Sequence, residues 1–145
     1  VDVIERFIKI IKPRKIYLGE KDMQQLKIIE DYINKKKIGT IVVGCRTIRE
    51  KNGIALSSRN QLLTTKERKI ASNIYKYLLN KKKELINKKK SILDIKKTIT
   101  KFGVAKIDYI KILDVNRIIK PNKKKRRFKI FIAYFLGAVR LIDNI

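Results

Sequence analysis

The first third of the chain alternates amphipathic helical patterns with short apolar runs. Apolar residues recur at helical spacing from Val3 to Ile11, and Pro13 then ends that pattern. The pattern predicts a helix before Pro13, a buried strand over 15–18, a helix over 22–36 that buries Leu26, Ile29 and Ile33, and a strand over 40–43. This order of helix, strand, helix, strand is typical of a parallel α/β sheet.

After residue 50 the pattern changes to helices followed by strands. Thr64 and Glu67 stand at the spacing of a capping box, which marks the start of a long helix. The sequence predicts a turn at Asn52-Gly53, a polar loop over 57–60, a helix after Thr64 that buries Ile70, Ile74, Tyr77 and Leu78, a helix from Ser91 to near Gly103 that carries Ile92, Ile95 and Ile99, and strands around 107–112, 129–135 and 139–142. We therefore expect a small α+β domain over 49–145, separated near residue 48 from the α/β part over 1–48.

Composition allows a packed core and points away from several classes of protein. Hydrophobic residues make up 44% of the 145 residues, and no apolar run approaches the roughly 20 residues that span a bilayer. A soluble cytoplasmic protein is the default expectation.

The single cysteine, Cys45, cannot form an internal disulfide, and we expect it to be a small apolar filler at a strand end. Because the chain has no histidine, a zinc site of the usual Cys/His type is excluded.

The formal charge of +25 raises the question of a nucleic-acid partner. Of the 38 basic residues, 28 are lysines, and they are scattered among isoleucine and asparagine in almost every segment. The lysine runs at 35–37, 81–83 and 88–90 and the mixed lysine–arginine run at 123–127 fall at predicted helix ends and turns. A solvated surface explains them, and we favour it over a dedicated nucleic-acid patch.

The stretch GEKDMQQL, residues 19–26, follows the first predicted strand directly. Ligands of open parallel sheets bind beyond the carboxyl ends of the strands. Gly19 would let a ligand approach the backbone, the amides of the helix N-terminus favour an anion, and Lys21 adds a mobile positive charge. Gln25 lies one turn further along and offers a donor and an acceptor. The alternative is that Asp22 only caps the helix and Lys21 is only solvated.

A second polar stretch, Ser57-Ser58-Arg59-Asn60, combines two hydroxyls and a guanidinium. Such a set is suited to holding phosphate oxygens as charge develops in phosphoryl or nucleotidyl transfer. By itself the stretch is weak, because the same residues are common in ordinary loops.

Together, in this order and spacing, the two stretches resemble the pantothenate synthetase family, whose enzymes join pantoate and β-alanine. The family's strand–helix junction reads like YxGEKDxQQL, which matches residues 17–26, and its later loop reads like TxREx(D/N)GxAxSSRNxxL, which matches residues 47–62, TIREKNGIALSSRNQLL. The C-terminal residues 137–144, GAVRLIDN, look like the family's closing strand. The resemblance therefore covers essentially the whole chain.

The resemblance implies the C-terminal part of a Rossmann-like nucleotidyltransferase parallel sheet, followed by a small α+β domain. It implies activation of pantoate by ATP to an adenylate, release of pyrophosphate, attack by the β-alanine amine and release of AMP. Mg²⁺ accompanies the nucleotide in the family, and the enzyme is usually a cytoplasmic homodimer. Carried over by position, the resemblance implies that Gln25 binds pantoate. It implies that the ATP site is formed by Gly19, Glu20, Lys21, Asp22, Ile48, Leu56, Ser57, Ser58 and Arg59. Among these, the catalytic residues would be Lys21, Ser57, Ser58 and Arg59. No residue is assigned as a metal ligand.

Two departures from the family pattern qualify this interpretation. Family members usually have Val-Pro-Thr where this chain has Cys45-Arg46-Thr47. The family also carries an HxGH-type motif in its N-terminal half, and this chain has no histidine. We therefore expect the chain to begin part-way through the nucleotide-binding domain. Expressed alone, it would keep an ordered domain over 49–145, fray or aggregate before residue 48, and show no pantoate-dependent exchange until an N-terminal half is supplied.

Two other functions remain open on sequence alone. A basic nucleic-acid-binding protein would bind duplex or RNA with a steep dependence on salt. Another enzyme of the wider nucleotidyltransferase group would catalyse ATP–pyrophosphate exchange that depends on an amino acid or a nucleotidyl acceptor, whereas the family function requires dependence on pantoate.

Overall fold

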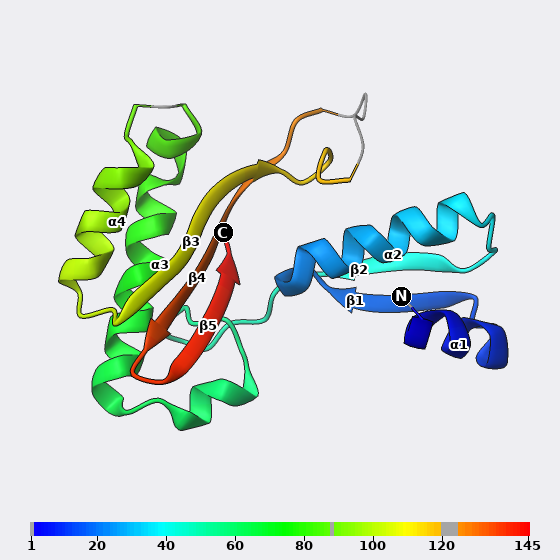
Figure 1. Ribbon diagram of the computed structural model, residues 1–145, viewed down its shortest axis with the longest axis horizontal. Helices are drawn as coiled ribbons and strands as arrows, with labels where there is room; N and C mark the ends of the chain where they lie inside the picture. Colours follow the sequence, from blue (N-terminus) through cyan, green and yellow to red (C-terminus); the bar gives the residue numbers. More distant parts are fainter. Residues whose placement is uncertain (1, 88, 120–124) are drawn as a thin grey trace. The chain divides into compact units, whose positions relative to one another are not determined.

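The computed structural model describes residues 2–87, 89–119 and 125–145. The chain divides into two compact units, residues 1–47 with 116–125, and residues 48–115 with 126–145. The first unit has parallel strands and the second antiparallel strands (Figure 1). The α/β class predicted from the sequence is confirmed.

The first unit is a strand–helix–strand crossover preceded by one helix. Its elements are α1 (Asp2–Ile11), β1 (Lys15–Gly19), the 3₁₀ turn η1 (Glu20–Asp22), α2 (Met23–Lys35) and β2 (Ile41–Cys45). Strands β1 and β2 pair in parallel, so that Lys15 faces Ile41 at one end and Gly19 faces Cys45 at the other. The four predicted elements are confirmed, and the carboxyl ends of the two strands lie at one edge of the pair.

The core of the first unit is small. Ile8 of α1 packs with Ile29 and Ile33 of α2, and Ile16 and Val42 of the strands pack against them. The stripe on α2 is buried as predicted. The strand over 15–18 was expected to be buried, but its burial alternates, because only one face of a strand meets the helices. The first helix likewise leaves most of its apolar residues exposed, namely Val3, Phe7, Ile10 and Ile11.

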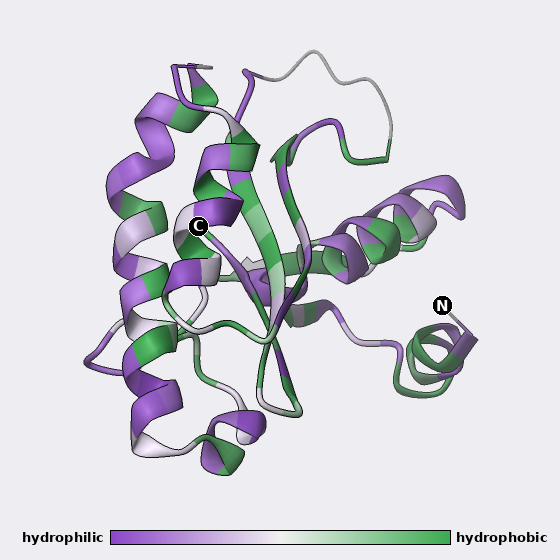
Figure 2. Cartoon of the chain, turned by 60° about the vertical axis from the view of Figure 1, so that its left-hand side comes forward, coloured by the Kyte–Doolittle hydropathy of each residue, from purple (hydrophilic) through white to green (hydrophobic). Residues whose placement is uncertain are grey.

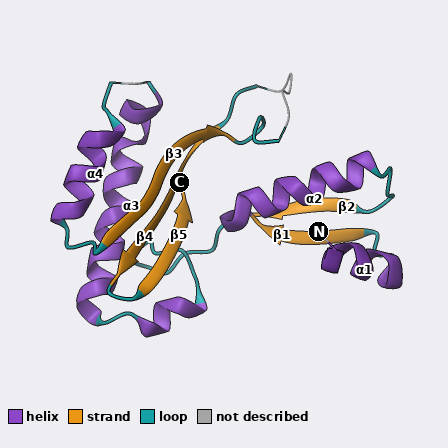
Figure 3. Ribbon diagram, in the orientation of Figure 1, coloured by secondary structure: helices purple, strands orange, loops and turns teal. Residues whose placement is uncertain are grey.

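The second unit is an antiparallel sheet with two helices on one side. Its elements are η2 (Ser58–Leu62), α3 (Thr65–Ile86), α4 (Ile92–Lys101), β3 (Lys106–Asp114), β4 (Phe128–Leu136) and β5 (Val139–Asn144). The strand order is β3-β4-β5, and the two helices lie along the sheet (Figure 3). The predicted α+β arrangement, with helices before strands, is confirmed.

The helices of the second unit form where local signals and apolar spacing agree. Thr64 and Glu67 form the full capping box, and Ser91 caps α4 by accepting a hydrogen bond from the Asp94 amide. Hydrophobic and hydrophilic residues both occur along each long helix, as expected of amphipathic helices (Figure 2). The common core contains Ile74, Leu78 and Leu85 of α3, Ile95 and Ile99 of α4, and Ile110, Ile130, Ile132, Leu136 and Leu141 of the sheet.

The lysine runs are placed less uniformly than predicted. Lys35 ends α2 and residues 36–37 follow it, but residues 81–83 lie inside α3. Lys82 is partly buried there, and burial together with the charges of Lys129 and Arg127 lowers the pKa of its ammonium group. Lys88 and residues 120–124 lie outside the described residues, so the runs at 88–90 and 123–127 are described only in part.

A short hairpin over 48–56 opens the second unit. The Glu50 amide donates to the Ile54 carbonyl, the Leu56 amide donates to the Ile48 carbonyl, and the Gly53 amide closes the turn onto the Glu50 carbonyl. The predicted Asn52-Gly53 turn is confirmed. Gly53 has φ +94°, and a Cβ there would lie 2.2 Å from the Tyr75 ring, so both backbone and packing require glycine.

We predict that Gly53→Ala destabilises the second unit. The positive φ alone costs an alanine at least about 1–2 kcal/mol, and the Tyr75 ring would also have to move. Urea unfolding followed by circular dichroism should show a lower midpoint. Gly39→Ala is the matched control, because a Cβ at Gly39 meets nothing within 4 Å, and it should unfold like the unsubstituted chain. Equal midpoints for both variants would contradict the role of Gly53.

Candidate active site

The first motif lies where β1 ends and α2 begins. Gly19 ends β1, Glu20–Asp22 form the 3₁₀ turn, and α2 starts at Met23. Gly44 on the paired strand lets this turn lie close, because a Cβ at Gly44 would be 3.2 Å from Leu26 Cδ1 and 3.7 Å from Glu20 Cγ. The turn therefore stands at the carboxyl edge of the parallel pair, the edge at which open sheets bind ligands.

Nothing within the described chain explains a glycine at position 19. Its φ of −67° and ψ of 129° are open to any residue, and a Cβ there would meet no atom within 4 Å. By contrast, Gly44 and Gly53 are each restricted by close neighbours. Gly19 thus leaves open space beside an exposed backbone at the end of the strand, as a close-lying ligand would require.

The part of the alternative in which the Asp22 side chain caps the helix is wrong. Asp22 occupies the N-cap position of α2, but its side chain makes no capping hydrogen bond. Asp22 and Gln25 are exposed, and Glu20 and Lys21 are half-buried. These four residues lie within six positions, 20–25, at one end of one unit, where the amides of the helix start and the Lys21 ammonium favour an anion.

The departure at Cys45-Arg46 falls at this same edge. Cys45 ends β2 opposite Gly19, so its expected place at a strand end is confirmed. It is exposed, so the expectation that it fills apolar space is wrong. Arg46 is also exposed and adds a second cation to the edge that carries Lys21. The strand keeps its register through Cys45 without the usual proline.

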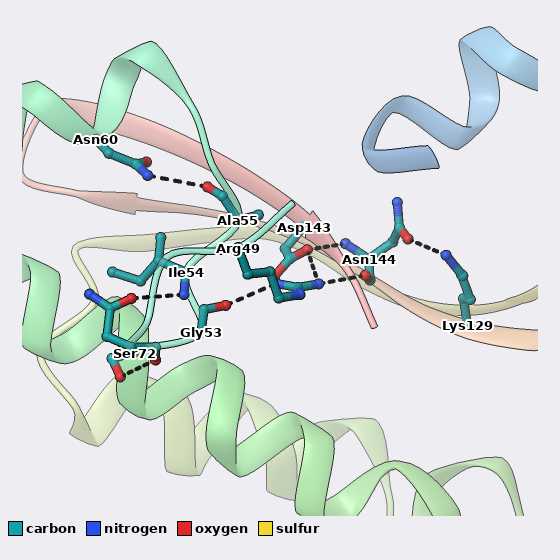
Figure 4. A network of polar contacts seen from close by, with 10 residues as sticks. Arg49, Gly53, Ile54, Ala55, Asn60, Ser72, Lys129, Asp143 and Asn144 are labelled. Carbon is teal, nitrogen blue, oxygen red and sulfur yellow. Dashed lines mark hydrogen bonds and ion pairs between the residues drawn. The ribbon is translucent and has the colours of Figure 1, made fainter. Parts of the chain in front are cut away.

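The second motif is tied to the sheet by Arg49. Its guanidinium makes two hydrogen bonds to the Asp143 carboxylate, at 2.7 and 2.9 Å, and two more to the carbonyls of Gly53 and Asn144, at 3.0 and 3.2 Å (Figure 4). It also lies over the Tyr75 ring, 4.3 Å from the centroid. Bidentate charge-assisted pairs are among the stronger polar contacts, so Arg49 fixes the 48–56 hairpin against β5.

The predicted phosphate-holding residues follow this hairpin. The segment expected as a polar loop is the 3₁₀ turn η2, which the Ser57 hydroxyl caps by accepting from the Arg59 amide at 3.3 Å. Ser58 and Arg59 are exposed, and the Arg59 guanidinium makes one long hydrogen bond, 3.4 Å, to the Arg140 carbonyl. Ile48 and Leu56 expose 72% and 56% of their surface. The hydroxyl of Ser58 and most of the Arg59 head group thus remain accessible.

Asn60 differs from its neighbours, because it is 2% exposed. Its side-chain amide donates to Glu50 Oε1 at 2.7 Å and to the Ala55 carbonyl at 3.2 Å. The hydrogen bond from Asn60, further bonds from Asn52 and Arg68, and the Arg68 charge lower the pKa of the Glu50 carboxyl below its ordinary 4.5. The stabilisation from ionised Glu50 is therefore present above pH 4.5 and is lost as the pH falls through the lowered value.

The predicted site residues form two groups, one in each unit. Gly19, Glu20, Lys21, Asp22 and Gln25 are together in the first, and Ile48, Leu56, Ser57, Ser58 and Arg59 are together in the second. Sequence reasoning missed Arg49, Glu50 and Asn60 as the residues that hold the second group. The signal was present, since all three stand inside the matched stretch TIREKNGIALSSRN, but their contacts reach residues far along the chain.

Comparison with known proteins decides the family. The family model described as pantoate-β-alanine ligase matches residues 1–145. The chain belongs to this family. The resemblance found in the two motifs is thus confirmed over the full length of the chain.

Relatives and solved structures agree with the family match. The chain is 37% identical to a pantothenate synthetase of Flavobacterium psychrophilum and 39% identical to one of Clostridioides difficile, over 99% and 98% of this chain and 52% of each relative. A pantoate-β-alanine ligase of Francisella tularensis, solved with β-γ ATP and β-alanine, has a TM-score of 0.74 at 34% identity over 99% of this chain and 47% of that one. The pantothenate synthetase of Thermus thermophilus has a TM-score of 0.78 at 28% identity, and the match covers 99% of this chain and 53% of that one. The chain therefore spans about half the length of the relatives it matches.

Proposed function

We propose that this chain takes part in the ATP-dependent ligation of pantoate and β-alanine. The pantoate carboxylate attacks the α-phosphorus of ATP and pyrophosphate leaves; the β-alanine amine then attacks the acyl carbon and AMP leaves. The family match over residues 1–145 carries the proposal. The solved Francisella relative, whose complex contains β-γ ATP and β-alanine, supports the choice of ligands.

The positions of the two groups support distinct roles in this reaction. Gly19, with the turn that follows it, offers accessible backbone for the nucleotide, and Lys21 and Arg59 would balance charge on its phosphates. Ser58 offers an accessible hydroxyl, whereas Ser57 would contribute its hydroxyl while capping η2. Ile48 and Leu56 would act largely through backbone atoms, and exposed Gln25 would hold pantoate.

The remaining family properties are part of the same proposal. Mg²⁺ would accompany ATP, and Glu20 and Asp22 at the strand end supply carboxylates of the kind that Mg²⁺ binds together with phosphates. Residues 1–48 would serve as part of the nucleotide-binding domain and residues 49–145 as the C-terminal domain. The complete enzyme would be a cytoplasmic homodimer. No helix in the described ranges is both long and apolar enough to cross a membrane.

The proposal is tested in a chimera in which this chain replaces the matching half of the Clostridioides difficile relative. We predict pantoate-dependent exchange of labelled pyrophosphate into ATP. Lys21→Ala and Arg59→Ala should each lower this exchange by about two orders of magnitude or more, as expected for loss of one charge-stabilising group.

Lys15→Ala is the matched control, because Lys15 is exposed at the opposite end of β1. It should leave exchange unchanged. Exchange that requires an amino acid instead of pantoate, or a folded chimera with no exchange, would contradict the proposed function.

We predict that Gln25→Ala raises the KM for pantoate by about three- to tenfold, the effect of losing one hydrogen bond to the substrate, and changes the KM for ATP little. Gln24→Ala is the matched control: Gln24 is the same residue type, is also exposed and is adjacent on α2. Steady-state kinetics of the chimera provides both constants. A higher KM for ATP with unchanged pantoate saturation in Gln25→Ala would contradict the assigned role.

A further inference from the structure

The exposed segment 56–59 is closed at its base by one buried side chain. The Asn60 amide nitrogen donates to the Ala55 carbonyl, across the four residues between them (Figure 4). Ala55 is 5% exposed and Asn60 2%, whereas Leu56, Ser58 and Arg59 are exposed. The base of the segment is thus anchored in the second unit, and its tip is accessible.

Glu50 and Arg68 hold Asn60 in this position. Glu50 Oε1 accepts from the Asn60 side chain at 2.7 Å, and Arg68 Nη2 donates to the Asn60 carbonyl at 2.6 Å. Arg68 Nη1 also donates to Glu50 Oε2 at 3.2 Å, and Asn52 donates to the same oxygen at 3.2 Å. One carboxylate therefore joins the hairpin, the start of α3 and the residue directly after Arg59.

This cluster, formed by Glu50, Asn52, Asn60 and Arg68, is distinct from the anchor of the hairpin. The anchor is the pair of Arg49 with Asp143, and the remaining hydrogen bonds of Arg49 go to the carbonyls of Gly53 and Asn144. The contacts of Glu50 and Arg68 instead converge on the side chain and backbone of Asn60. Loss of the Glu50 carboxylate would loosen the segment next to Arg59 while leaving the Arg49 anchor in place.

We propose that Glu50, acting through Asn60, is a positioning residue that holds Ser58 and Arg59 where they contact the phosphates of the nucleotide; this inference rests on the proposed function. Glu50 itself touches neither substrate nor reacting atoms. Electrostatic stabilisation of a transition state depends on groups held in advance at the correct distance. A loosened Arg59 would therefore slow turnover more than it weakens binding.

The first test is a double-mutant cycle in the chimera. Glu50→Gln keeps the shape of the side chain and removes its charge, and it should lower kcat about tenfold or more, with less than about a threefold change in the KM for ATP. In an Arg59→Ala background the same substitution should lower kcat less than about twofold, because the group it positions is gone. An equal loss of kcat in both backgrounds, or no loss in either, would overturn the proposal.

Glu84→Gln is the matched control. Glu84 also forms an ion pair, with Lys81 of the same helix at 2.8 Å, and it lies on α3 away from the segment. It should change neither constant. If the unsubstituted chimera shows no exchange, the proposed function has failed, and the phosphate-positioning role fails with it; the second test then decides only whether Glu50 restrains the segment.

The second test needs no activity and uses the unaltered 145-residue chain. Trypsin cleaves after Arg59 only when the neighbouring backbone opens, and buried Asn60 restrains that opening. Early digests mapped by mass spectrometry should show cleavage after Arg59 several-fold faster in Glu50→Gln than in Glu84→Gln or the parent chain. Equal cleavage rates at this bond would overturn the positioning role, whatever the chimera does.

Discussion

The ion pair between Arg49 and Asp143 is the contact that ties the hairpin over 48–56, and with it the start of the exposed segment 56–59, to the sheet of the second unit. It joins residues 94 positions apart, and its side chains expose only 20% and 11% of their surface. Removing one partner of such a largely buried pair leaves the other charge unpaired, at a cost of about 3 kcal/mol. Within the hairpin over 48–56 only Ile54 and Ala55 are buried apolar residues, so polar contacts largely fix its position. These are the Arg49–Asp143 pair with the stacking of Arg49 on Tyr75, and the hydrogen bonds from Arg68 and Ser72 of α3 to Glu50 and Asn52.

The two motifs achieve accessibility by different physical means. In the first unit a short turn follows a strand, Gly19 leaves open space, and the Asp22 side chain is not committed to capping. In the second unit, inward-facing polar residues, Glu50 and Asn60, hold a segment whose outward residues, Ser58 and Arg59, remain exposed. Within one matched stretch of sequence, then, some polar residues serve structure and others are available for chemistry.

Much of the fold could be predicted from local patterns. The capping box at Thr64 and Glu67, the stripe on α2 and the three C-terminal strands all depend on residues a few positions apart, and all are confirmed. Burial was predicted less well for the strand over 15–18 and for Cys45, because burial depends on which other elements cover a surface. The anchoring contacts of Arg49 could not be found from spacing, since Asp143 lies at the other end of the unit. Asn60 was grouped with the polar loop because it is a polar residue. Its side chain is buried instead, because it donates to Glu50 Oε1 and to the Ala55 carbonyl inside the unit.

The central claim is that the accessible backbone at the end of β1 receives the nucleotide. It is tested most directly by measuring ATP affinity of the chimera by isothermal titration calorimetry for Gly19→Ala and Gly39→Ala. Neither glycine has a positive φ, and neither leaves a Cβ near any atom of the chain, so both variants should unfold at the temperature of the parent. The account predicts that Gly19→Ala weakens ATP binding by about tenfold or more and that Gly39→Ala does not, because the methyl group at position 19 would occupy the space that the nucleotide fills. Unchanged ATP affinity in Gly19→Ala, with binding intact in the parent, would contradict it.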